Sequence, residues 1–161
     1  MFKRILLLKH IPLNLDLGRL CLRLIAFVPM FLKHGTEKVF GFQAAIQHYQ
    51  VGNIDPLHIG LLPTLLIATF SDAICSLLMI FGLATRWAAL FSFCNLFVVW
   101  VFIDHFVTVR RGLTAGEPVV LYMAACVTLF FIGAGKFSID GLIERAPEKE
   151  AQQGHASMAQ A

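Results

Sequence analysis

The sequence predicts an all-α integral membrane protein that folds as a four-helix bundle, because apolar residues gather in long stretches and charged residues lie mostly between them. Hydrophobic residues make up 58% of the chain and charged residues only 14%, whereas a soluble domain carries about 25% charged residues. The 15 Phe residues suit packing between helices and against lipid. A composition this poor in charge does not supply the polar exterior that a soluble domain of this size requires.

Each apolar stretch is expected to form one membrane span. A helix needs about 20 mostly apolar residues to cross the hydrocarbon core of a bilayer. The second stretch clears this length, and the other three reach it with flanking residues or tilt. Ala84-Thr85-Arg86, between the second and third stretches, predicts a tight helical hairpin. The four stretches are 17–32, 59–84, 87–103 and 118–134.

The distribution of basic residues predicts that both termini lie in the cytoplasm. Basic residues outside the spans number seven on the side of the termini and four on the other side, and an excess of them marks the cytoplasmic side. The first group is Lys3, Arg4, Lys9, Arg86, Lys136, Arg145 and Lys149, and the second is Lys33, Lys38, Arg110 and Arg111. The net charge is only +3, and no basic block suggests nucleic acid as a partner.

The chain divides into three expected parts. Residues 1–16 are expected to form a cytoplasmic N-terminal segment, because the apolar run at 5–8 is too short for a signal peptide. Residues 17–142 form the predicted transmembrane domain. Residues 143–161 are a predicted cytoplasmic tail, which is rich in Ala, Gln and Gly toward its end and is expected to be disordered.

Asp72 is the most informative single residue, because it lies in the middle of the second apolar stretch. A carboxylate at the bilayer centre costs about 2.5–3.5 kcal/mol on insertion scales, so it must face the bundle interior. One hypothesis is a proton-handling or ligand-binding acid, and the alternative is a hydrogen bond that holds helices together. Arg23 is the first choice as its partner, although Arg19 and Arg23 also suit snorkelling to the membrane surface.

A second polar cluster is expected where the helices meet the opposite surface. His34 ends the first stretch, His105 follows the third, and Glu117 precedes the fourth. Two histidines and a carboxylate at one depth suit hydrogen bonds to the carbonyls of a quinone, or a metal ion. No His-x-x-x-His or Glu-x-x-His element is present, so no metal is expected. Each histidine taken alone also fits a polar residue at the membrane surface.

The four cysteines fall one in each predicted helix, at Cys21, Cys75, Cys94 and Cys126. Three of them share a depth near the membrane centre, which would suit redox chemistry between thiols. No Cys-x-x-Cys element is present, however, and free cysteine commonly behaves as a small buried apolar residue. We therefore expect packing roles and no disulfide framework.

Taken in order, four passages resemble the DoxX family of small bacterial membrane proteins. The sequence FLKHGTEKVFGF at 31–42 is similar to the family's HG-x-x-K-x-FG signature. Asp72 occupies the acidic position of the second helix, where Glu is more usual. GLATRWAAL at 82–90 resembles the GL-x-TR-x-AAL hairpin, and GAGKFSID at 133–140 resembles the G-x-G-[KR]-x-S-x-D ending. The resemblance covers residues 17–142.

The resemblance implies an integral membrane protein with four helices and a redox role. A related branch, DoxD, is a subunit of a thiosulfate:quinone oxidoreductase. Other relatives are described as membrane partners of superoxide-detoxifying and sulfur-transfer enzymes. The resemblance therefore indicates the fold more firmly than the reaction.

The leading hypothesis is a redox-associated protein of the bacterial inner membrane, with several membrane passes, that binds a quinone-like or other small hydrophobic ligand. His34 and His105 would exchange hydrogen bonds with ligand carbonyls, and Glu117 would orient a histidine. Asp72 with Arg23 would carry or stabilise a proton. Buried acids and histidines can titrate near neutral pH in a site of low dielectric constant.

The alternative is a non-enzymatic membrane anchor or assembly factor for a soluble redox or sulfur-transfer protein. The expected partners are the lipid bilayer, such a protein and a second copy of the chain. Whether the chain is itself an enzyme stays open at this point. A small transporter is a weaker hypothesis, because four helices without repeats leave little material for alternating access.

Overall fold

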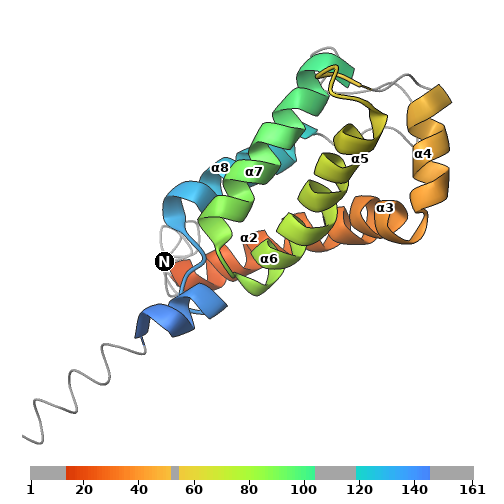
Figure 1. The fold of residues 1–161 in the computed structure, drawn as a ribbon. Coiled ribbons are helices and arrows are strands. Elements are labelled where there is room, and N and C mark those ends of the chain that lie inside the picture. Colours follow the sequence, from red (N-terminus) through yellow and green to blue (C-terminus); the bar gives the residue numbers. More distant parts are fainter. Residues whose placement is uncertain (1–13, 52–54, 104–118, 146–161) are drawn as a thin grey trace, which may run out of the picture.

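The structure is a computed structural model that describes residues 14–51, 55–103 and 119–145, and these residues form helices and turns without a strand (Figure 1). Three segments of π-helix, η1 to η3, interrupt or extend the α-helices. The elements are α2 (Leu15–Met30), η1 (Phe31–Gly35), α3 (Thr36–Phe40), α4 (Phe42–Val51), α5 (Leu61–Thr69), η2 (Phe70–Cys75), α6 (Ser76–Phe81), α7 (Thr85–Val98), η3 (Val99–Ile103) and α8 (Val119–Ile132). A last helical turn spans 139–145 and crosses the expected boundary at 143.

The first apolar stretch forms one helical run, α2–η1–α3, that continues past its expected end at 32. The side chain of Asn14 caps its start by accepting a hydrogen bond from the Leu17 amide at 3.1 Å. The run contains Pro29, which removes one backbone donor, and the π-helical segment η1 follows directly. Gly41 ends α3, and α4 then crosses beside α5 at one end of the molecule (Figure 1).

Two helical runs are long and apolar enough to cross a membrane. Leu61–Phe81 has 21 residues and Thr85–Phe102 has 18, while the apolar helix α8 is shorter, at 14 residues. Before the first of these runs, the carboxylate of Asp55 accepts hydrogen bonds from the Gly60 amide at 2.8 Å and the Thr64 hydroxyl at 2.9 Å. Loss of hydration acts to raise the pKa of Asp55, but these hydrogen bonds outweigh it and lower the pKa.

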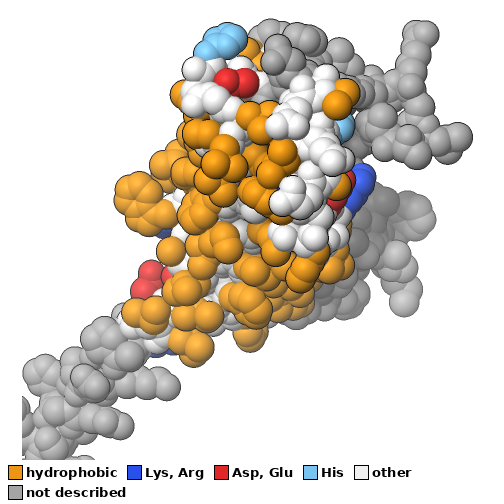
Figure 2. All heavy atoms as spheres, turned by 45° about the vertical axis from the view of Figure 1, so that its right-hand side comes forward, with side chains coloured by type: hydrophobic (Ala, Val, Ile, Leu, Met, Phe, Trp, Pro, Cys, Tyr) orange, Lys and Arg blue, Asp and Glu red, His pale blue; other side chains and the backbone are white. Residues whose placement is uncertain are grey.

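The helices pack around one apolar core. Helix α7 lies along α8, and α2 contacts both α6 and α8 (Figure 1). Large apolar side chains are also exposed, and Figure 2 shows them as a broad band across one face. An exposed apolar band of this kind suits contact with lipid. The fully buried large side chains of the core are Phe27, Met30, Leu65, Met79 and Leu129.

Arg23 links the end of α6 to the segment that follows α8, and it does not pair with Asp72. Its side chain is 2% exposed, and its guanidinium donates to the carbonyl oxygens of Ala134 at 2.7 Å, Phe137 at 2.9 Å and Ile80 at 3.2 Å. Carbonyls at helix ends lack partners within their own helix. The expected pairing with Asp72 is therefore wrong, as is snorkelling of Arg23, because these carbonyls bind the guanidinium inside the protein.

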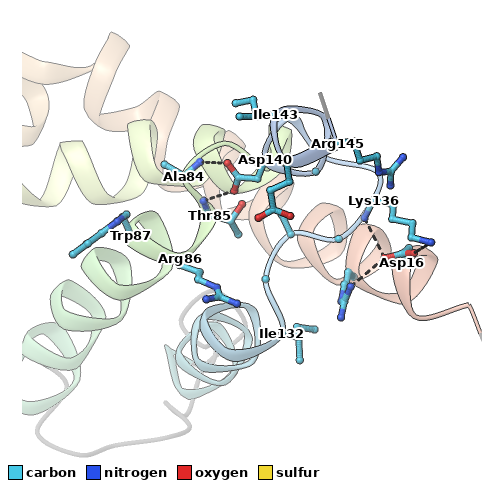
Figure 3. Close-up of a pocket in the computed structure, with 16 residues that line it drawn as sticks. Asp16, Ala84, Thr85, Arg86, Trp87, Ile132, Lys136, Asp140, Ile143 and Arg145 are labelled. Atoms are coloured by element: carbon cyan, nitrogen blue, oxygen red, sulfur yellow. Dashed lines mark hydrogen bonds and ion pairs between the residues drawn. The ribbon is translucent and has the colours of Figure 1, made fainter. Parts of the chain in front are cut away.

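The expected hairpin between the second and third stretches is present, and Asp140 secures it (Figure 3). Its carboxylate accepts hydrogen bonds from the amides of Ala84 at 2.7 Å and Thr85 at 2.9 Å, at the start of α7. The Asp140 amide donates to the carbonyl of Gly82 at 2.9 Å. Gly82 has a φ of 71°, and a Cβ there would lie 2.7 Å from Nη1 of Arg23. Glycine is therefore required both by the backbone and by the space.

Candidate functional site

A buried ion pair joins the first and second helical runs. The ammonium of Lys38, on α3, donates a hydrogen bond to Oδ2 of Asp72, on η2. The two side chains are only 15% and 10% exposed. A charged pair so far from water is stable only while both partners are present, because either charge alone would pay a large desolvation cost. Asp72 therefore faces the protein interior as expected, with a lysine as its partner.

The ion pair lies where two π-helical segments meet. Gly35, the last residue of η1, packs against the backbone of η2: a Cβ on Gly35 would lie 2.8 Å from the Asp72 carbonyl oxygen and 3.1 Å from Cα of Ala73. The backbones can approach this closely only because Gly35 has no side chain. π-helical turns are rare and often occur at functional sites. Two of them in direct contact beside a buried charge pair favour this region as the functional site.

Replacing Gly35 with Ala should separate η1 from η2. The new methyl group would meet backbone atoms, which cannot rotate away as a flexible side chain can. We expect a loss of about 1–3 kcal/mol in the free energy of unfolding, measured by SDS titration of the detergent-solubilised protein. Gly18→Ala is the matched control, because nothing lies within 4 Å of its Cβ position. Equal stability of the two variants would contradict the close contact of the two segments.

Tyr49 connects the ion pair to an apolar cavity. Tyr49 lies on α4, which contacts the α3 helix that carries Lys38, and Tyr49 lines a cavity of about 280 Å³. Its walls come from α4, α5, α7, the start of η3 and the turn before α5, and Tyr49, Thr64 and Asn95 are its hydrogen-bonding side chains. The other lining residues are Pro56, Leu57, Ile67, Ala68, Phe91, Cys94, Val98 and Val99. An apolar cavity with a few polar groups is typical of sites for small organic ligands.

The expected site residues fall in different parts of the structure. His34 is half-buried on η1, one residue before Gly35, and it does not line the apolar cavity. His105 and Glu117 lie outside the described residues. Sequence reasoning missed Lys38 as the partner of Asp72, because it placed Lys38 in a connection beyond the end of the first helix. The available signal was the lysine of the HG-x-x-K passage, which lies four residues after His34.

The cysteines of the described residues are all free thiols. Cys75 and Cys126 are buried in the core, whereas Cys21 and Cys94 are exposed. Within the described parts of the chain, no group of three His, Cys, Asp or Glu side chains is placed to hold a metal ion. Of these four cysteines, Cys94 is the one that lines the apolar cavity, whereas Cys75 lies on η2 together with Asp72.

Comparison with known proteins agrees with this arrangement. A family model described as DoxX matches residues 18–105, which is more than half of the chain. The chain belongs to the DoxX family. The DoxX match includes both partners of the ion pair, Lys38 and Asp72, together with Gly35 and the hairpin at 84–86. No curated protein and no solved structure matches the chain. DoxX membership indicates a membrane protein that is associated with redox systems.

Proposed function

We propose that this DoxX protein is a multi-pass protein of the bacterial inner membrane that binds a quinone-like or other small hydrophobic ligand as part of an oxidoreductase system. The observation that carries the proposal is the position of Tyr49, which lines the apolar cavity from α4, the helix that packs between α5 and the α3 helix of Lys38. A ligand in the cavity would lie beside the buried charges of the protein. Family membership supports the redox association.

The proposed membrane arrangement is a four-helix bundle with both termini in the cytoplasm. Its four spans are α2–η1–α3, α5–η2–α6, α7–η3 and α8 with its flanking residues. Contacts between these runs around one core support the bundle, and the excess of basic residues near the termini supports the orientation. In this arrangement, the ion pair lies at a depth where the surrounding hydrocarbon strengthens its electrostatic effects.

The side chains around the cavity fit a ligand with polar groups on an apolar ring. The Tyr49 hydroxyl and the Asn95 amide can each donate a hydrogen bond to a carbonyl oxygen. A quinone takes up protons along with electrons when it is reduced, and Lys38 with Asp72 would hold a proton next to Tyr49. At about 280 Å³ the cavity lies just below the range of about 300–1,000 Å³ typical of ligand pockets. The cavity therefore suits the single ring of a quinone, and an isoprenoid or alkyl tail would lie outside the cavity.

The proposal keeps roles for the histidines and for Glu117. His34 lies on the same helical run as Lys38, one turn earlier, and would exchange hydrogen bonds or protons with the site. His105 and Glu117 would complete the polar side of the ligand site from the segment between η3 and α8. Electrons would come from a redox or sulfur-transfer protein, and a second copy of the chain is a further proposed partner.

Filling the cavity should weaken ligand binding strongly. In Cys94→Phe, a phenyl ring would occupy space among Tyr49, Phe91 and Asn95. We expect a short-chain ubiquinone analogue, titrated by tryptophan quenching in nanodiscs, to bind at least about tenfold more weakly than to the unaltered protein. Cys21→Phe is the matched control, because Cys21 is exposed on α2 and does not line the cavity.

Tyr49→Phe tests the hydrogen bond separately from the shape of the cavity. Removal of one hydroxyl should weaken binding of the analogue by roughly threefold to tenfold, since one neutral hydrogen bond is worth about 0.5–1.5 kcal/mol. Equal affinities for the unaltered protein, Cys94→Phe and Tyr49→Phe would exclude this cavity as the site. Absence of any binding would favour the alternative function, a membrane anchor or assembly factor for a soluble redox or sulfur-transfer protein.

A further inference from the structure

A second cavity, of about 630 Å³, lies at the opposite end of the helices from the ligand cavity, and the two share no lining residue. It opens where α2 and α7 begin and α8 ends (Figure 3). Charged side chains surround it, in contrast to the ligand cavity. The charged lining residues are Asp16, Arg19, Arg86, Lys136, Asp140, Glu144 and Arg145.

Two of the three acidic residues are already engaged by protein donors. Asp16 accepts hydrogen bonds from the Arg19 guanidinium and from the Lys136 amide, both at 3.1 Å. The Lys136 ammonium lies 4.0 Å from the other oxygen of Asp16. Asp140 accepts from two amides at the start of α7, as described above. Glu144 is thus the remaining acid whose negative charge can offset the positive charges of Arg86 and Arg145.

Several donors around this cavity have no acceptor. Arg86 makes no hydrogen bond or ion pair within the described residues, and its guanidinium lies over the end of α8, about 3.8 Å from the Cβ position of Gly133. The Thr85 side chain is 1% exposed, and its hydroxyl has no partner in the described part of the chain, nor has Nη2 of Arg145. Figure 3 places Thr85 and Arg86 on the same wall. The Thr85 hydroxyl and Nη2 of Arg145 are buried, and an unpaired buried donor carries a free-energy cost that a bound acceptor would remove. Arg86 is exposed, so its guanidinium is accessible to a ligand.

Three exposed apolar side chains lie among the charged lining residues and form an apolar part of the rim. Trp87 is 75% exposed, Ile143 is 60% exposed and Ile132 is 41% exposed, and all three line the opening. Exposed Trp is typical of the boundary between hydrocarbon and headgroups. Basic pockets at this boundary bind anionic lipid headgroups. The combination of guanidinium donors and apolar rim therefore suits a phosphate group that is attached to hydrocarbon.

We propose that this cavity binds a phosphate group, with Arg86 as its main ligand and the Thr85 hydroxyl as a second donor. A guanidinium donates two parallel hydrogen bonds to phosphate oxygens. The apolar rim favours the phosphate of an anionic phospholipid over a free phosphate ester. Arg19 and Lys136 contribute positive charge to the cavity while they remain bound to Asp16.

The test is native mass spectrometry of the full chain with phosphatidylglycerol and, separately, phosphatidylcholine. Arg86→Gln should reduce retention of phosphatidylglycerol roughly fivefold, the effect of one basic residue near a lipid surface. Arg86 is exposed, so the substitution leaves the fold intact. Lys33→Gln removes one positive charge at η1, far from this cavity, and should leave retention unchanged. Arg86→Lys should retain more phosphatidylglycerol than Arg86→Gln and less than the unaltered protein.

A second arm separates the two sources of phosphate. Inorganic phosphate is titrated calorimetrically into the protein in phosphatidylcholine nanodiscs, with and without Arg86→Gln. Phosphate binding that depends on Arg86 would support a free phosphate ester as the ligand. If inorganic phosphate does not bind but phosphatidylglycerol is retained selectively, the lipid is the ligand. Equal losses in Arg86→Gln and Lys33→Gln would overturn the proposal, as would no dependence on Arg86 in either arm.

Discussion

Lys38→Met should destabilise the protein by about 3–5 kcal/mol, because it leaves the carboxylate of Asp72 buried without its partner. The methionine has nearly the volume of the lysine stem, so packing is largely kept and the lost charge dominates the effect. The double substitution Lys38→Met with Asp72→Leu should recover most of the loss, since it removes both charges together. The free energy of unfolding is measured by SDS titration in detergent, followed by circular dichroism.

The control for this prediction is another lysine on the same helical run. Lys33→Met removes an exposed lysine from η1 and should change stability by less than about 1 kcal/mol. The double-mutant cycle then gives the coupling energy between Lys38 and Asp72 directly. A double variant no more stable than Lys38→Met alone would mean that the two residues are not coupled.

Arg23→Met should cost about 3 kcal/mol or more, because three carbonyl oxygens lose their shared donor inside the protein. Ile80 lies near the end of α6, and Ala134 and Phe137 lie in the segment after α8. Arg23→Lys should show an intermediate loss, since an ammonium keeps the charge without the planar fork of a guanidinium. The same SDS titration measures both variants.

Arg19 provides the matched comparison for Arg23, because it lies one turn earlier on α2. Its side chain is 27% exposed and pairs with Asp16, so Arg19→Met should cost no more than about 1 kcal/mol. Comparable losses in Arg19→Met and Arg23→Met would show that the carbonyl contacts contribute little. If Arg23→Met unfolds during purification, Arg23→Lys still distinguishes the two outcomes.

The helices were predictable from the sequence, because long apolar stretches and the short hairpin at 84–86 leave few alternatives. Burial of Asp72 was predictable for a related reason: a carboxylate in the middle of an apolar helix must avoid lipid. Its partner was not predictable. The apolar stretch that predicts the first helix ends at 32, whereas the helical run continues through η1 and α3 and places Lys38 in contact with Asp72. π-helical turns also change the angular register, so regular helical spacing does not hold across η1 and does not indicate which side chains after it face Asp72.

The polar residues near the two ends of the molecule needed the tertiary structure as well. Nothing in local spacing indicates that Arg23 reaches carbonyls more than a hundred residues further along the chain. The position of Tyr49 beside the cavity depends on how α4 packs against α5. The roles predicted for His34, His105 and Glu117 stay predictions.

In the proposed membrane arrangement, the contacts of Arg23 would also set an order of events during synthesis. Its carbonyl partners lie 57, 111 and 114 positions later in the chain, so the guanidinium cannot be satisfied when the first helix leaves the ribosome. An unpaired arginine is costly within hydrocarbon, and the nascent helix would hold Arg23 at the aqueous boundary until the last helix arrives. Insertion of α8 would then allow the first helix to take its final depth. The first span would therefore complete its membrane integration only after the last span has been inserted.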